Sequence, residues 1–297
     1  MPKIPKKSPE ALRGFAVAGE LDELAAGLAA NPTLARSLVG EPGESLLIHA
    51  IRSRQADCAL ALAPLSNATR RAKHGELPLI LASKMGLAEC VAALIPLSSP
   101  VAAKDGFDAL AAACSEGHHG AVKVILAAQP HWALAIDRQG QTPLLLALAL
   151  RQEACSNLLL PHSDCSVLAH GAESVLFRAA RAGFGGIVRK VLSLSAARKL
   201  TAFGWTPLMG AAFNQTSNED AVLDCVDALL PLSDTKRRVS KRDHWSYGLC
   251  AKDLAVSRGL LRVASRIEAF EAAQKEREEL ALLPLPSEAP LRRGPRI

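Results

Sequence analysis

The sequence has 297 residues, of which 49% are hydrophobic and 4% aromatic, and its formal net charge is +6. A chain of this length and composition can bury a large continuous core. The N-terminal ten residues contain lysines but no apolar run long enough for a secretory signal, and the longest apolar run, 143–150, is too short to span a bilayer. We therefore expect a cytoplasmic location and no contact with a membrane.

A helix-start phrase recurs along the chain. It reads GESLLIHAI at 43–51, GELPLILAS at 75–83, GQTPLLLAL at 140–148 and GWTPLMGAA at 204–212. In the last copy Thr206 can cap a helix that begins at Pro207, where the missing N–H of proline costs nothing. A recurring helix start indicates a repeat protein.

The phrases align on one anchor residue in each repeat. The anchors are Leu12, Leu47, Leu79, Leu110, Leu144, Leu176, Leu208 and Lys252. The first six intervals average about 33 residues. Alanine stands three positions after seven of the eight anchors, and glycine stands seven positions after five of them. We expect the first helix to end at this glycine, and we predict positive φ for Gly86, Gly117 and Gly183.

The phrase G-x-T-P-L-x-x-A, an inter-helix glycine and an apolar second-helix pattern together resemble the ankyrin repeat. Gly117 and His118 match the Gly-His pair at that family's inter-helix turn. The resemblance implies an all-α fold, an ankyrin-repeat solenoid of about eight helix-turn-helix repeats with hairpin or loop fingers. We expect the solenoid at 8–283, ending in a capping helix, between a basic tail at 1–7 and a disordered tail at 284–297. The Ala/Arg/Leu-rich composition suggests a bacterial source.

Prolines in one register, at 64, 96, 161 and 231, are expected to end second helices and lead into the fingers. The seventh repeat is abnormal, because its anchor is 44 residues from the next one. The extra residues fall between its helices, at 214–220, and in the finger at 233–248. Insertions in a solenoid form loops on one face and often belong to binding.

Seven cysteines invite a disulfide or metal interpretation. Cys58, Cys90, Cys155 and Cys225 share one position ahead of the second-helix apolar run, so we interpret them as core residues in successive layers. Cys114, with the neighbouring histidines 118 and 119, has ligand-like spacing, but a structural zinc site needs four ligands. We predict no metal, no disulfide and no cofactor. Because no catalytic motif is present, we also predict no enzyme activity.

The positive charge is concentrated in short segments. Eleven of the 35 basic residues lie in segments 3–7, 236–242 and 292–296, and the remaining 24 face 29 acidic residues. The repeat body therefore has a negative net charge, whereas a nucleic-acid binder is expected to carry a positive stripe on its folded body. The candidate basic patch consists of Lys236, Arg237, Arg238, Lys241 and Arg242. It could contact phosphates or serve as a localisation signal, or it is a solvated loop.

Aromatic residues mark the candidate partner-binding surface. They are Phe107, Phe203, Trp205, Phe213, Trp245 and Tyr247. Five of the six lie in the seventh and eighth repeats, and aromatic anchors with polar neighbours are typical of binding hot spots. We expect Trp205→Ala and Tyr247→Ala to weaken partner capture and to change the melting temperature little. The alternative is that Phe203, Trp205 and Phe213 merely pack against the neighbouring finger and helix.

The resemblance implies a non-catalytic, monomeric protein–protein interaction scaffold that holds a partner protein through its concave groove and fingers. An alternative is a secreted effector, delivered into another cell, or a regulator, whose basic loop contacts nucleic acid or an acidic surface. Export as an effector without a classical signal peptide stays open under either function.

Overall fold

The computed structural model describes residues 8–40, 43–98, 103–192, 199–214, 218–241 and 244–282. Within 103–192, side chains are described from residue 108 onward. The tails expected at 1–7 and 284–297 lie outside the described residues. No helix in the described ranges is both long and apolar enough to cross a bilayer.

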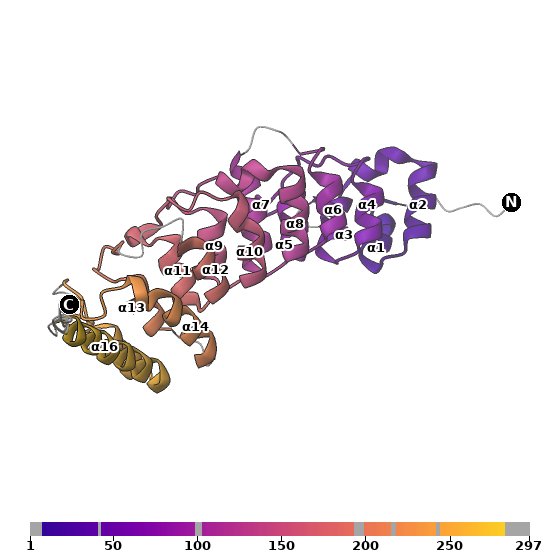
Figure 1. Cartoon of the computed structure of the whole chain (residues 1–297). Coiled ribbons are helices and arrows are strands. Elements are labelled where there is room, and N and C mark those ends of the chain that lie inside the picture. Colours follow the sequence, from indigo (N-terminus) through magenta and orange to yellow (C-terminus); the bar gives the residue numbers. More distant parts are fainter. Residues whose placement is uncertain are drawn as a thin grey trace, which may run out of the picture.

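Eight helix pairs follow one another along the described part of an elongated molecule, with α1 and α2 at one end and α16 at the other (Figure 1). The first helices of the pairs are α1 Pro9–Ala18, α3 Leu46–Arg52, α5 Pro78–Met85, α7 Ala103–Ser115, α9 Pro143–Ala149, α11 Val175–Ala182, α13 Pro207–Ala212 and α15 Ala251–Ser257. The second helices are α2 Leu21–Ala30, α4 Ala56–Leu62, α6 Ala88–Leu94, α8 His119–Ala128, α10 Glu153–Leu159, α12 Gly185–Leu192, α14 Glu219–Leu229 and α16 Leu261–Ala281. Each first helix contacts the first helix of the next pair. The architecture is a stack of repeated units, as the period in the sequence predicts.

The first helices begin where the capping residues predict. The hydroxyl of Thr206 accepts a hydrogen bond from the backbone N–H of Met209 at 3.2 Å, and Pro207 follows it as the first helical residue. Ser8 caps α1 in the same way, through the N–H of Ala11 at 3.3 Å. These caps satisfy backbone donors that a helix leaves without partners at its start.

The core is continuous from one end of the stack to the other. All seven leucine anchors are fully buried, and so are the seven alanines three positions after an anchor. Alanine is needed there because successive first helices approach closely. Each repeat therefore covers the apolar face of its neighbour, and stability accumulates through interfaces between adjacent repeats.

The predicted left-handed glycines are confirmed. Gly86, Gly117 and Gly183 have φ of 74°, 75° and 84°. At Gly86 and Gly117, the side chain that stands eight positions after the anchor of the following repeat lies over the turn. A Cβ at Gly86 would stand 2.7 Å from Nδ1 of His118. Glycine is therefore required both by the backbone conformation and by close packing between repeats.

Second helices end at the predicted prolines. Helices α4, α6, α10 and α14 each end two residues before a proline, at 64, 96, 161 and 231. After α10 and α14 the chain continues through the short 3-10 turns η3 Leu160–His162 and η5 Leu230–Leu232. Of the other 3-10 turns, η1 Pro32–Arg36 follows α2, η2 Pro130–Leu134 follows α8, and η4 His170–Ala172 precedes α11. A proline cannot donate the next helical hydrogen bond, so the chain turns towards the finger.

The fingers are tight turns closed by a backbone hydrogen bond. The backbone N–H of the residue seven positions before an anchor donates to the backbone carbonyl of the residue three positions before the same anchor. In the finger before α13 this bond runs from Thr201 to Trp205 and measures 3.0 Å. Asp137 and Gln141 form the same bond, also at 3.0 Å. In the described chain one finger contains a two-stranded antiparallel ribbon, made by β1 Leu38–Val39 and β2 Glu44–Ser45.

The stack ends in a helix that is longer than the other second helices. Val263, Ala264 and Ile267 of α16 are buried, and the helix contacts α14 and α15. Most of its remaining side chains are exposed, and about half of them are charged. One apolar face thus closes the core, and the other faces are polar, as a terminal repeat requires.

Candidate functional site

The last finger differs from the other described fingers in its loop. Its closing hydrogen bond runs from the N–H of Val239 to the carbonyl of Leu249 at 3.0 Å, so the loop covers 240–248. The corresponding loop of the preceding finger is only 202–204. At the base of the enlarged finger, Asp253 accepts a hydrogen bond from the N–H of Cys250 at 2.9 Å. This bond is the first cause of the lowered pKa of Asp253, and nearby Arg238 lowers it further.

The enlarged finger places two rings over the end of α13. They complete a group of aromatic side chains around a cavity of about 150 Å³, which we call the aromatic cavity. Its rings belong to Phe177, Phe203, Trp205, Phe213, His244 and Trp245. Four of the six predicted partner-binding residues therefore lie together. The sequence analysis missed Phe177, which follows a core anchor, and His244, which belongs to the inserted loop.

Trp205 is the buried base of the aromatic cavity. It is only 7% exposed, and its indole N–H donates to the hydroxyl of Ser246 at 3.1 Å. Its ring lies perpendicular to that of Phe213, with centroids 5.2 Å apart. The expectation that Trp205 can be truncated with little effect on melting is therefore corrected, because the ring packs inside the fold. Phe203 and Trp245 are 40% and 61% exposed and form the accessible rim.

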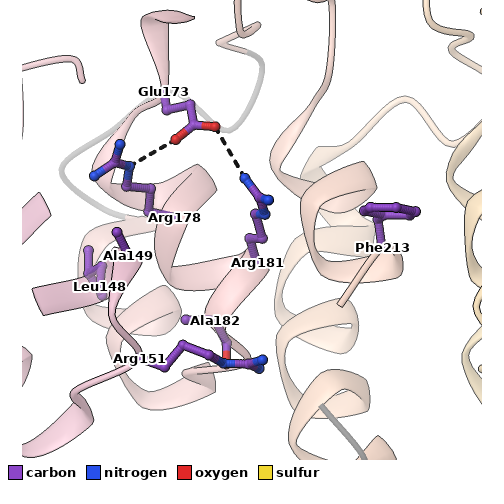
Figure 2. A pocket seen from close by; sticks show the side chains of 8 residues that line it. All are labelled: Leu148, Ala149, Arg151, Glu173, Arg178, Arg181, Ala182 and Phe213. Atoms are coloured by element: carbon purple, nitrogen blue, oxygen red, sulfur yellow. Dashed lines mark hydrogen bonds and ion pairs between the residues drawn. The ribbon is translucent and has the colours of Figure 1, made fainter. Parts of the chain in front are cut away.

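A second cavity of about 300 Å³ adjoins the aromatic cavity, and we call it the arginine cavity. Arg151, Arg178 and Arg181 line it together with Glu173 and Phe213 (Figure 2). Figure 2 shows Arg178 and Arg181 reaching Glu173 from two sides, with Arg151 below them. Glu173, Arg181 and Phe213 line both cavities, so the two form one continuous surface over repeats five to eight.

Arg178 is a structural member of this surface. It donates to Glu173 at 2.9 Å, to the side-chain oxygen of Gln141 at 2.8 Å and to the carbonyl of Leu145 at 2.7 Å. Its side chain is 10% exposed, whereas that of Arg181 is 50% exposed and lies 3.4 Å from Glu173. Arg178 therefore connects repeats five and six, and Arg181 presents its guanidinium to solvent.

Arg151 occupies the position where most repeats have the left-handed glycine. Its φ is 60°, an uncommon value for a residue with a side chain. Its guanidinium donates to the carbonyl of Ala182 at 3.0 Å and to the side-chain oxygen of Asn214 at 2.7 Å. One side chain thus joins repeats five, six and seven. These bonds offset part of the backbone strain at this position.

Two further cations stand on the aromatic rings. The guanidinium of Arg258 lies 3.6 Å from the centroid of Phe213, and the ammonium of Lys241 lies 4.7 Å from the centroid of Phe203. Such cation–π contacts are worth roughly 0.5–1 kcal/mol at exposed sites. The aromatic cavity is therefore rimmed by positive charge.

The candidate basic patch is dispersed in the structure. Lys241 packs on Phe203, and Arg238 donates to the carbonyl of Gly248 and lies 3.4 Å from Asp253. Arg237 lines a separate cavity of about 460 Å³ beside α16. Lys236 is exposed, and Arg242 lies outside the described residues. The described cations of the loop thus point to different surroundings.

One of the predicted aromatic residues does not line the aromatic cavity, and the side chain of another is not described. Tyr247 belongs to the enlarged finger and is 50% exposed, but it does not line the cavity. Phe107 lies in α7, where its side chain is outside the described part of the chain.

The cysteines are free thiols. The four that share one register are buried as expected, and burial raises the pKa of Cys225 to about 12 and that of Cys90 to about 11. Cys114 is also buried, and its thiol hydrogen-bonds that of Cys155 in the next repeat, which with burial raises the pKa of Cys114. Among the described residues, no three His, Cys, Asp or Glu side chains are arranged to hold a metal ion.

The stacked helix pairs and finger turns define a helical repeat solenoid of the ankyrin-repeat fold. The structure is similar to that of the ankyrin repeat domain of Bcl-3, a member of the IκB protein family, with a TM-score of 0.58. The two sequences are 20% identical, and the alignment covers 75% of this chain and 97% of the Bcl-3 domain. No protein-family model and no curated protein sequence matches this chain.

Proposed function

We propose that this chain is a non-catalytic scaffold that binds a partner protein over the aromatic and arginine cavities of repeats five to eight. The observation that carries the proposal is the exposure of Phe203 and Trp245, at 40% and 61%, around a preformed cavity. Exposed aromatic rings beside arginines are the usual composition of a binding hot spot. The ankyrin-repeat fold supports the proposal, since stacked repeats offer an extended surface for partners.

The buried base of the cavity favours binding through preorganisation. Trp205 is fixed by Ser246 and by the rings around it, so the exposed rings need little ordering when a partner arrives. Rings that are already ordered lose less conformational entropy on binding.

The test is quantitative affinity purification from a lysate of the source organism, using the full chain as bait. Phe203→Ala and Trp245→Ala should each lose a shared set of captured proteins. Leu38→Ala is the matched control, since Leu38 is 43% exposed in the first finger, at the other end of the stack. A partner that all three variants retain would show that the binding surface lies elsewhere.

The basic loop supplies the competing function, contact with nucleic acid. Neutralising Lys236 and Arg237 together, which line neither of the two cavities, should leave the captured proteins unchanged if the scaffold function is right. Loss of tight, salt-sensitive oligonucleotide binding in this variant would favour the competing function instead.

A further inference from the structure

The two adjoining cavities offer two kinds of contact side by side. One presents guanidinium groups and the other presents aromatic ring faces, and Arg181 and Phe213 line both. We propose that this surface binds an extended acidic segment of the partner protein. A carboxylate of the segment meets Arg181 and Arg151, and an adjacent apolar or aromatic side chain enters the aromatic cavity. This inference rests on the proposed function and specifies the chemistry of the partner.

The charge around the cavities is strongly positive. Arg151, Arg178 and Arg181 line the arginine cavity, and Lys241 and Arg258 stand on rings of the aromatic cavity. Glu173 is the one carboxylate among the described residues that line either cavity. It contacts both Arg178 and Arg181, so the linings of the two cavities contain three guanidinium groups and one carboxylate. A negatively charged group from a partner complements this surplus.

The exposed arginines retain donors for a carboxylate. A guanidinium has five N–H donors in a planar fork that matches a carboxylate. Arg181 contacts Glu173 through Nη1 alone, and Arg151 uses only Nη2 for its two bonds, in the part of the chain that the structure describes. The remaining N–H groups can form the paired, charge-assisted hydrogen bonds that make such contacts specific.

The aromatic cavity has the size of one side chain. Its volume is about 150 Å³, and a cavity of that size in another protein accommodates benzene. A phenylalanine or leucine side chain therefore fits it. The arginine cavity, at about 300 Å³, adjoins it directly, so neighbouring residues of one extended segment can fill both.

A peptide suits this surface better than a nucleic acid does. Outside the three basic segments the chain has 24 basic and 29 acidic residues, which gives a negative body. A nucleic acid carries charge along its whole length and needs a positive stripe, whereas these cations are confined to one location. A short acidic segment is attracted by the cations at the cavities and does not extend over the negatively charged remainder of the repeat body.

The experiment begins with selection of random 12-residue peptides displayed on phage against the immobilised full chain. The enriched peptides are then synthesised, and their affinity is measured by fluorescence anisotropy. We expect Asp or Glu within a few residues of Phe, Leu or Trp. Arg181→Gln should weaken the binding about tenfold, and so should replacing the peptide carboxylate with its amide. The two changes combined should cost little more than either alone, because they remove the same contact.

Lys84→Gln is the matched control. Lys84 lies five positions after its anchor in repeat three, as Arg181 does in repeat six, and it pairs with Glu76 at 3.5 Å. Its side chain is 43% exposed against 50% for Arg181, and its variant should bind the peptides as the wild type does. Equal melting temperatures for the two variants would show that the fold is intact.

Three results would overturn the inference. If the peptides require Trp245 but bind the Arg181→Gln variant at wild-type affinity, the scaffold function is supported and the acidic partner segment is ruled out. If the peptides bind both the Phe203→Ala and the Trp245→Ala variants at wild-type affinity, the scaffold function proposed for this surface is ruled out as well. Displacement of the peptides by a single-stranded oligothymidylate at physiological salt would assign the surface to nucleic acid.

Discussion

Repeats six and seven place different side chains at the same two positions, three residues before the anchor and five residues after it. In repeat six these are Glu173 and Arg181, an ion pair with a 3.4 Å contact. In repeat seven they are Trp205 and Phe213, two perpendicular rings with centroids 5.2 Å apart. Repeats two and three follow the ionic form, with Glu44 paired to Arg52 and Glu76 paired to Lys84.

The exchange changes what the surface can do. An exposed ion pair stays hydrated and contributes roughly 0–1 kcal/mol, so it leaves a polar surface. A ring pair buries apolar area and attracts further rings, and in repeat seven it supports Phe177, His244 and Trp245. One repeat with the aromatic form, placed beside an ionic one, thus creates the boundary between the aromatic and arginine cavities.

The largest expected effect comes from removing the aromatic form. Trp205→Ala should lower the free energy of unfolding by about 3–5 kcal/mol, because a buried ring and its neighbours lose their packing. Glu76→Ala, at the same position of repeat three, should cost at most about 1 kcal/mol, because it removes a half-exposed ion pair. Urea denaturation followed by circular dichroism measures both. Equal losses would mean that the two forms do not differ energetically.

Two glycines with nearly the same φ allow the cost of backbone strain to be measured separately from the cost of lost packing. Gly86 has φ of 74° and Gly259 has φ of 73°, but only the first has the His118 ring against it. Nothing among the described atoms lies within 4 Å of a Cβ placed at Gly259. Gly259→Ala should therefore cost about 1 kcal/mol from strain alone, and Gly86→Ala about 2 kcal/mol. Thermal melts that rank the two variants in the reverse order would contradict this packing role.

Arginine replaces that glycine in repeats two and five, and the two arginines should respond differently. Arg54 and Arg151 have φ of 58° and 60°. Arg54 is exposed and its side chain forms no hydrogen bond or ion pair within the described chain, so Arg54→Gly should stabilise by about 0.5–1 kcal/mol through relief of strain. Arg151→Gly gains the same relief but loses the bonds to Ala182 and Asn214, each worth roughly 0.5–1.5 kcal/mol.

Comparing the melting temperatures of the two variants gives the energy of the Arg151 contacts. The Arg151 variant should melt below the Arg54 variant. If both were stabilised equally, the contacts of Arg151 would contribute nothing to stability.

Local features of the fold could be predicted from the sequence. The caps at Ser8 and Thr206, the glycine turns and the proline stops each depend on a few neighbouring residues, and the period repeats the signal eight times. Burial of the anchors follows from the same period. Only one register of the repeats is compatible with a buried core, because a shift of register would expose the apolar face of every repeat.

The site could be predicted only in part. The sequence indicates the aromatic concentration in repeats seven and eight, but the exposure of Trp205 depends on the conformation of the 240–248 loop. Arg151 and Asn214 are 63 residues apart, so their contact depends on the stacking of three repeats. The charge count gives a negative body and cannot show that the cations outside the basic segments gather in one cavity. Alignment of the positions flanking each anchor is the signal that would have paired Trp205 with Phe213.

The smallest expected effect concerns the base of the enlarged finger and its dependence on pH. The folded state lowers the pKa of Asp253 from its ordinary 3.8, mainly because its carboxylate accepts the N–H of Cys250, with help from Arg238. Because folding lowers this pKa, the ionised carboxylate stabilises the fold at pH values above the pKa of the unfolded chain. This contribution disappears as the pH falls through the pKa of the folded state. Asp253→Asn should therefore be less stable than the wild type at pH 6. The difference should shrink below about pH 3.8 and vanish once the wild-type carboxyl is protonated. Paired urea titrations at pH 6 and pH 2.5 measure it, and a difference that persists unchanged in acid would show that the charge of Asp253 does not hold the finger.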